Sequence, residues 1–185
     1  MSRAPKQISF FKVPSKIHGG ATCAGNPRTS RPLSTKMPIH LVMRSSRAVG
    51  GRSFRAKQLA PQIDAVIKKH AKLNGVKIYR FANAGDHLHF ALKITKPELF
   101  KKFLRVVSGL IARLVLKAEK GSAKLRSGSR FWDARPFTRV ATWGKSFDIL
   151  CSYLALNNWE ALGFMKHTKR DGKRKLWIVK FDPDP

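Results

Sequence analysis

The sequence predicts an α+β fold in which an antiparallel sheet carries helices on one face. Four stretches between residues 37 and 143 have the composition and the alternation of apolar and polar residues that are typical of strands. Two longer stretches between them have apolar residues at helical spacing. The resulting order, β-α-β-β-α-β, is that of a ferredoxin-like sheet.

The first strand is predicted in MPIHLVMRS, residues 37–45. Two sets of residues alternate along it, and they are Ile39, Leu41 and Met43 on one side and His40, Val42 and Arg44 on the other. Apolar residues at helical spacing then predict a helix over 56–74, with Pro61 tolerated in its first turn. Gly75 directly after it is a favoured helix end.

A β-hairpin is predicted next. Its strands are VKIYRFA (76–82) and HLHFALKI (87–94), and the short link NAGD (83–86) joins them. Pro97 opens a long helix that has a broad apolar face and that Gly121 is expected to close.

The last part of the chain adds a strand, a helix and a small hairpin. After the basic loop SAKLRSGSR, the segment RFWDARPFTRVATW (130–143) suggests a strand interrupted by Pro136, and 146–157 has helical spacing. The segments GFMKH and KLWIVKF, on either side of a charged turn, predict a terminal hairpin. No internal repeat is seen.

The length of 185 residues suits one domain, and a hydrophobic content of 43% is enough to form a core. Residues 1–36 hold seven basic and no acidic side chains, with many Pro and Gly. We therefore expect a basic, mostly unfolded arm over 1–36 and a folded domain over 37–185. The arm either contacts DNA or is a solvated tail.

Charge is the dominant feature of the composition. There are 38 Lys and Arg against 10 Asp and Glu, which gives a net charge of +28. Such a surface favours nucleic acid as a partner, with a membrane surface as a weaker alternative. Two cysteines are too few for a zinc finger. The longest apolar run, 106–116, is interrupted by Arg113, and no secretion signal is visible, so a cytoplasmic location is expected.

His87 and His89 lie one residue apart in a predicted strand. Side chains alternate across a strand, so both imidazoles point to the same face, with Cβ atoms about 7 Å apart. Two rings at this spacing can converge on one metal ion. The spacing can also arise by chance, and two ligands do not make a catalytic site.

Tyr153 and Asn157 are four residues apart in the last predicted helix, hence on one side of it and one turn apart. The helix would present a phenol and an amide oxygen at the edge of its apolar face. An ordinary half-buried core tyrosine is the alternative for Tyr153. The only other tyrosine, Tyr79, lies in the predicted strand 76–82, next to the histidine strand, and not in a helix.

A His–hydrophobic–His strand followed some sixty residues later by a Tyr-x-x-x-Asn helix resembles the HUH single-tyrosine transposases. Four segments in order, covering about residues 37–165, resemble the REP-associated tyrosine transposase (RAYT) branch in particular, and they are MPIHLVMR, DHLHFAL, RFWDARPF and LCSYLALNNWEALGF.

The resemblance implies roles for four residues. His87 and His89 match the two metal-binding histidines, Tyr153 the nucleophile, and Asn157 the third metal ligand, which in many relatives is Gln. The cation would be Mg²⁺ or Mn²⁺. The implied activity is DNA transposition, in which single-stranded DNA is cleaved and transferred through a covalent 5′-phosphotyrosine intermediate. The chain departs from the branch at Asn158 and Glu160, where DNA contacts are expected.

The expected partner is single-stranded DNA, with hairpin-forming strands as one possibility. The expected location is the bacterial cytosol or nucleoid. The chain is expected to act as a monomer or a homodimer. The DNA-binding candidates are Arg44, Arg47, Arg52, Arg55, Lys124, Arg126, Arg130 and Arg135. A solvated basic surface is the alternative for these residues. The alternative for the whole chain is a noncatalytic nucleic-acid-binding protein, either an RNA-binding module or a domesticated relative.

Overall fold

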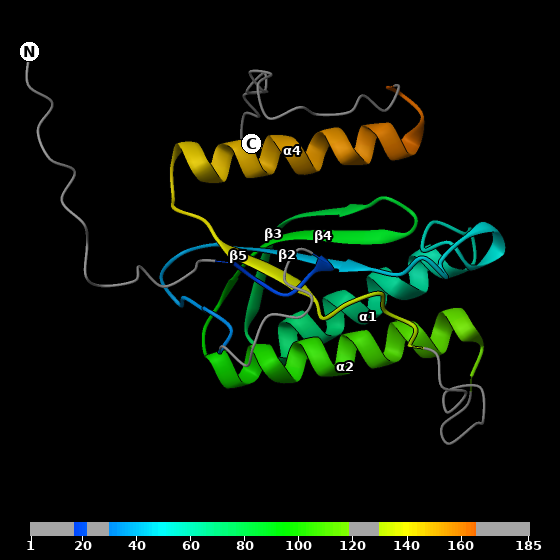
Figure 1. The fold of residues 1–185 in the computed structure, drawn as a ribbon, viewed down its shortest axis with the longest axis horizontal. Helices are drawn as coiled ribbons and strands as arrows, with labels where there is room; N and C mark the ends of the chain where they lie inside the picture. The colour runs from blue at the N-terminus through cyan, green and yellow to red at the C-terminus, as the bar shows by residue number, and fades with distance from the viewer. Residues whose placement is uncertain (1–16, 22–29, 119–129, 166–185) are drawn as a thin grey trace, which may run out of the picture.

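The computed structural model describes residues 17–21, 30–118 and 130–165 (Figure 1). Five strands form one sheet in the order β1-β5-β2-β4-β3, and every neighbouring pair is antiparallel. The strands are β1 (Ile17–His18), β2 (Ile39–Arg44), β3 (Val76–Asn83), β4 (His87–Ile94) and β5 (Phe137–Val140). A short 3₁₀ helix, η2 (Gly50–Arg52), follows β2. The antiparallel α+β fold predicted from the sequence is confirmed.

One face of the sheet forms the main core. Helices α1 (Leu59–Leu73) and α2 (Pro97–Leu116) cover this face and pack against each other (Figure 1). The alternating apolar residues of the two central strands point into it and are almost completely buried: Ile39, Leu41 and Met43 from β2, and Leu88, Phe90 and Leu92 from β4. The residues between them along β2 and β4 therefore point to the other face of the sheet.

Of the described helices, α4 (Lys145–Leu162) is the one on this second face, above the sheet in Figure 1. It packs mainly on β3 and also on β4. A small apolar cluster joins helix and sheet, and it consists of Ala82, Ala91, Ala141, Leu150 and Leu154. In the part of the chain that the structure describes, the histidine strand therefore has the main core on one face and helix α4 on the other.

Some element boundaries differ from those predicted. Helix α2 ends at Leu116, before Gly121, because Lys117 adopts a left-handed conformation (φ 49°) and Ala118 N donates to Arg113 O. Helix α4 continues five residues beyond 157, to Leu162, and Gly163 directly after it is also left-handed. Strand β5 is short because Pro136, which lacks an N–H, directly precedes it.

The first strand of the sheet comes from the segment expected to be an arm. Ile17 and His18 pair with Arg139 and Thr138 of β5, and Arg31 Nη1 donates to Pro136 O at 2.8 Å. A two-residue strand has too little periodicity to be predicted. Residues 1–16 and 22–29 of the arm, most of the basic loop and the KLWIVKF half of the terminal hairpin lie outside the described residues. Among those described, no helix is both long and apolar enough to span a membrane.

Candidate active site

His87 and His89 point to the α4 side of the sheet, as the alternation along β4 predicts. Their ring centroids are 4.6 Å apart. His89 is 4% exposed, whereas the side chain of His87 is 27% exposed. One ring is thus enclosed between sheet and helix, and the other reaches the rim of the site.

Each of the two rings is held at Nδ1. His87 Nδ1 lies 2.5 Å from Asp86 Oδ1, and His89 Nδ1 lies 3.3 Å from His40 Nε2. Arg44 pairs with the other oxygen of Asp86, at 3.3 Å. A partner at one ring nitrogen fixes the tautomer and leaves the other nitrogen for a ligand. In both histidines the atom left in this way is Nε2.

His40 comes from β2 and is the buried neighbour of His89. Burial, and then the nearby Arg139 guanidinium, lower the pKa of His40 to about 4. The ring is therefore neutral near pH 7, and its Nε2 can accept a hydrogen bond from His89 Nδ1. Sequence analysis placed His40 on the correct face of the first strand without assigning it a role. Asp86, in the turn before β4, was also missed.

Tyr153 reaches the same site from α4. Its ring lies 5.5 Å from that of His89 and 6.0 Å from that of His40, both edge to face. Helix and sheet therefore bring together a phenol and the histidine cluster, which are more than sixty residues apart in sequence.

Asn157 lies one turn after Tyr153 and is 8% exposed. Its Nδ2 donates to the main-chain carbonyl of Tyr153 at 2.8 Å, so Oδ1 is the atom that could bind a cation. The described residues contain no cluster of three or more His, Cys, Asp or Glu side chains suited to a metal ion. A cation at this site would depend on two imidazoles and an amide.

The predicted DNA-binding arginines differ in their surroundings. Arg44, Arg52, Arg130 and Arg135 are exposed, and Arg44 also pairs with Asp86 and Asp133. Arg47 and Arg55 are half-buried, and Arg55 Nη1 donates to Asn83 O at 3.1 Å. Lys124 and Arg126 lie outside the described residues.

Tyr79 belongs to a different cluster. Its ring lies 5.5 Å from Trp143 and 5.4 Å from Phe147, where α4 begins, and Lys77 Nζ is 5.1 Å from its centroid. These contacts pack the start of α4 against β3. Of the two tyrosines, Tyr153 is the one beside the histidines.

Comparison with known proteins identifies the class of protein to which this fold and site belong. Residues 34–157 match the model of the Y1_Tnp family, described as "Transposase IS200 like". This match spans more than half of the chain. The chain is therefore a member of the IS200-like transposase family, and the resemblance found in the sequence is confirmed.

Two solved structures are similar to the chain. One is a REP-associated tyrosine transposase bound to a REP hairpin, at 13% identity and a TM-score of 0.55, covering 85% of this chain and 92% of that one. The other, described as a candidate transposase from Deinococcus radiodurans R1, has 17% identity and a TM-score of 0.40, with 60% and 84% covered. The first match supports the fold. No curated protein matches the chain.

Proposed function

We propose that this transposase cuts and rejoins single-stranded DNA through a covalent bond between Tyr153 and a 5′-phosphate. The observation that carries the proposal is the position of the Tyr153 ring, 5.5 Å from His89 in a site where Asp86 and His40 hold both β4 histidines at Nδ1. Family membership supports the same reaction class.

In the proposed step, the phenolic oxygen of Tyr153 attacks the scissile phosphorus. An O–P bond forms to the tyrosine as the bond from phosphorus to the 3′ oxygen breaks. The phenol loses its proton to solvent, and the leaving oxygen gains one and becomes a 3′-hydroxyl. Because the phosphotyrosine is itself a phosphodiester, a second 3′-hydroxyl can reverse the attack without ATP.

His87, His89 and Asn157 would hold the divalent cation, Mg²⁺ or Mn²⁺. The Nε2 atoms of the two histidines and Oδ1 of Asn157 are the atoms left for it, and imidazole and amide oxygen suit both ions to different degrees. When bound, the cation would polarise the scissile phosphate and offset its developing negative charge.

The proposed substrate is single-stranded DNA, including strands that fold into a hairpin. The net charge of +28 favours binding to a phosphate backbone, and the exposed arginines described above would contribute to it. The solved relative bound to a REP hairpin motivates testing hairpin DNA in particular.

Covalent capture tests the proposal, because the chain has only two tyrosines. The full chain, incubated with labelled single-stranded oligonucleotides and Mn²⁺, should give an adduct that survives denaturing electrophoresis. Tyr153→Phe should abolish the adduct while binding persists. Tyr79→Phe, the matched control, should retain it.

An adduct that persists in Tyr153→Phe would rule out the assigned nucleophile. Tight, salt-sensitive binding with no adduct from any variant, with or without metal, would instead favour a noncatalytic DNA-binding protein. The high charge of the chain supports that reading as the second candidate.

A further inference from the structure

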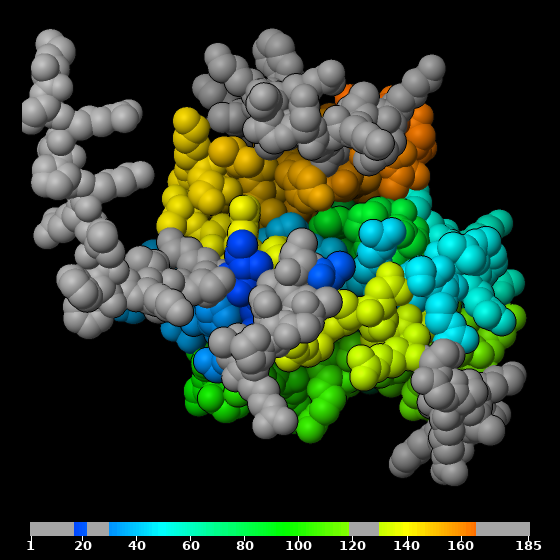
Figure 2. All heavy atoms as spheres, in the orientation of Figure 1, coloured from blue at the N-terminus to red at the C-terminus, as the bar shows by residue number. Residues whose placement is uncertain are grey.

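A cavity of about 420 Å³ lies beside Tyr153, between α4 and the strands β1, β5 and β2. Its lining residues are Ile17, His40, Phe137, Arg139, Ile149, Leu150 and Tyr153. Figure 2 shows the dark blue atoms of residues 17–21 at the surface, close to the yellow first half of α4. We propose that this cavity holds one unpaired nucleobase of the DNA strand that Tyr153 attacks. The inference rests on the function proposed above.

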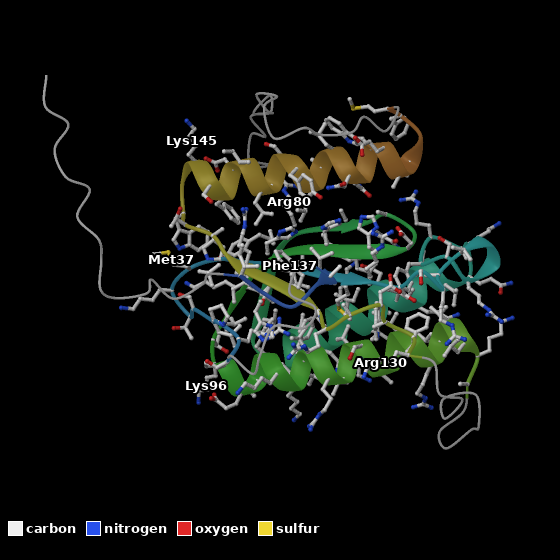
Figure 3. The ribbon with its side chains drawn as sticks, in the orientation of Figure 1. Met37, Arg80, Lys96, Arg130, Phe137 and Lys145 are labelled. Atoms are coloured by element: carbon white, nitrogen blue, oxygen red, sulfur yellow. The ribbon has the colours of Figure 1, made fainter. Side chains whose placement is uncertain are left out.

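The walls of the cavity suit a flat ring with apolar faces. Phe137, labelled on β5 in Figure 3, lies 5.9 Å from His40, and Tyr153 lies 6.0 Å from it, both edge to face. Ile17, Ile149 and Leu150 add aliphatic surface. Most ligand pockets are apolar with a few polar groups, and their volumes of roughly 300–1,000 Å³ include this one. A sugar-phosphate would find few polar partners here, whereas a base can stack.

Arg139 supplies the polar group. It pairs in register with His40 on one side and Ile17 on the other, so its side chain projects from the same face as theirs. No hydrogen bond or ion pair joins its side chain to another residue in the described ranges. Arg31, by contrast, is bonded to Pro136 O and Thr138 Oγ1. The donors of Arg139 can therefore meet the acceptor atoms on the edge of a base.

The position of the cavity determines which base it would hold. The Tyr153 ring forms part of the cavity wall and also contacts His89. A base in the cavity therefore belongs to a nucleotide next to the scissile phosphate. Phosphate contacts elsewhere would hold the strand without regard to sequence, and this pocket would fix its register.

The test measures binding to oligonucleotides that lack one base. A single-stranded oligonucleotide enriched from a random library by the full chain serves as the probe. Versions with an abasic site at each position in turn are titrated by fluorescence anisotropy. All proteins carry Tyr153→Phe, so that binding is read without covalent capture. We expect one abasic position to weaken binding about tenfold, the size of a lost stacking contact.

The same scan with Arg139→Ala identifies the cavity. This variant should bind the intact probe more weakly and should show a smaller abasic penalty at that position, because the base loses its hydrogen bonds to Arg139 but keeps its stacking contacts. The matched control is Arg135→Ala, an exposed arginine of the same segment. It should weaken all the oligonucleotides equally and keep the penalty. Thermal unfolding of each variant checks that it is folded.

Two outcomes would overturn the proposal. One is an abasic scan in which no position stands out, and the other is a penalty that is unchanged in Arg139→Ala. If the protein with Tyr153 intact still forms its adduct in either case, the proposed function stands and only the base pocket fails. Absence of all binding to single-stranded DNA would instead refute both.

Discussion

The orientation of the two β4 histidines depends on hydrogen bonds to residues outside the His-x-His pattern. Asp86 and His40 each occupy a ring Nδ1, and Arg44 in turn pairs with Asp86. Partners of this kind position a metal ligand and tune its basicity. Asp86 therefore has a positioning role for His87 in the proposed site.

Removal of Asp86 should weaken cation binding. In Asp86→Ala the His87 ring loses its partner and can rotate, so affinity for Mn²⁺ should fall by about 10–100-fold. Isothermal titration calorimetry on the folded protein measures this directly, without any need for activity.

Asp64→Ala provides the matched control for Asp86→Ala. Asp64 is an acidic residue of α1 that pairs with Lys68 at 2.7 Å, across the sheet from the histidines. Its loss should leave Mn²⁺ affinity unchanged. Equal affinities in the wild type and Asp86→Ala would show that His87 does not bind the ion as proposed.

The sequence predicted the shared side of His87 and His89 because alternation along one strand determines it. It did not predict His40 as their neighbour, because the register between β2 and β4 decides which residues meet. Here Val42 is opposite His89, and His40 reaches it on the diagonal. The position of the Asn157 amide could not be predicted either, because the packing angle of α4 on the sheet decides how far this side chain reaches toward the histidines.

At the scale of elements, the start of α4 depends on one glycine. Gly144 has φ 75° and ψ −141°, a conformation that residues with a side chain rarely adopt. It directs the chain from β5 across the second face, where Trp143 and Phe147 pack on Tyr79. The position of Tyr153 over the histidines follows from this turn.

Gly144→Ala should lower the free energy of unfolding by about 1–3 kcal/mol, because the backbone conformation becomes strained although the space around the new Cβ is open. Urea denaturation measures the change. The same substitution at the exposed Gly109 in α2, where φ is ordinary, should instead stabilise by about 0.5–1 kcal/mol. Effects of one sign at both positions would contradict this account of the turn.

Periodicity predicted most helices and strands but missed a bulge in β3. Ile78 pairs with Leu92 and Arg80 with Ala91, so Tyr79 is an extra residue. The bulge re-aims the chain, and both Tyr79 and Arg80 reach α4. Arg80, labelled in Figure 3, hydrogen-bonds Cys151, whose thiol pKa is raised by burial against the opposing effect of Arg80. A regular alternation gives no sign of such a shift.

At the scale of the whole molecule, the charge of +28 should make DNA binding strongly dependent on salt. Each phosphate contact to a single strand contributes about 0.7 to the slope of log K against log salt. Arg52→Ala removes an exposed cation, so it should reduce the affinity for DNA. It should also reduce the slope of log K against log salt by about 0.7. Fluorescence anisotropy between 50 and 200 mM salt measures it.

Arg55→Ala is the comparison for Arg52→Ala. Because Arg55 is half-buried and donates to Asn83 O, its loss should reduce stability and leave the slope unchanged. A slope that falls equally in both variants would mean that Arg55 also reaches the phosphates.

The two faces of the sheet are held by clusters of very different composition. Several phenylalanines, including Phe54, Phe90, Phe100 and Phe103, fill the α1–α2 side, whereas the buried cluster between α4 and the sheet consists of three alanines and two leucines, with only partly buried aromatic residues around it. Since stabilisation grows with buried apolar area, α4 should open locally before the rest unfolds, and its amides should exchange hydrogen faster than those of α1 and α2. In such an opened molecule the histidines would remain on an intact sheet while Tyr153 moved away. Gentle warming would then produce a protein that still binds a DNA strand but no longer cleaves it.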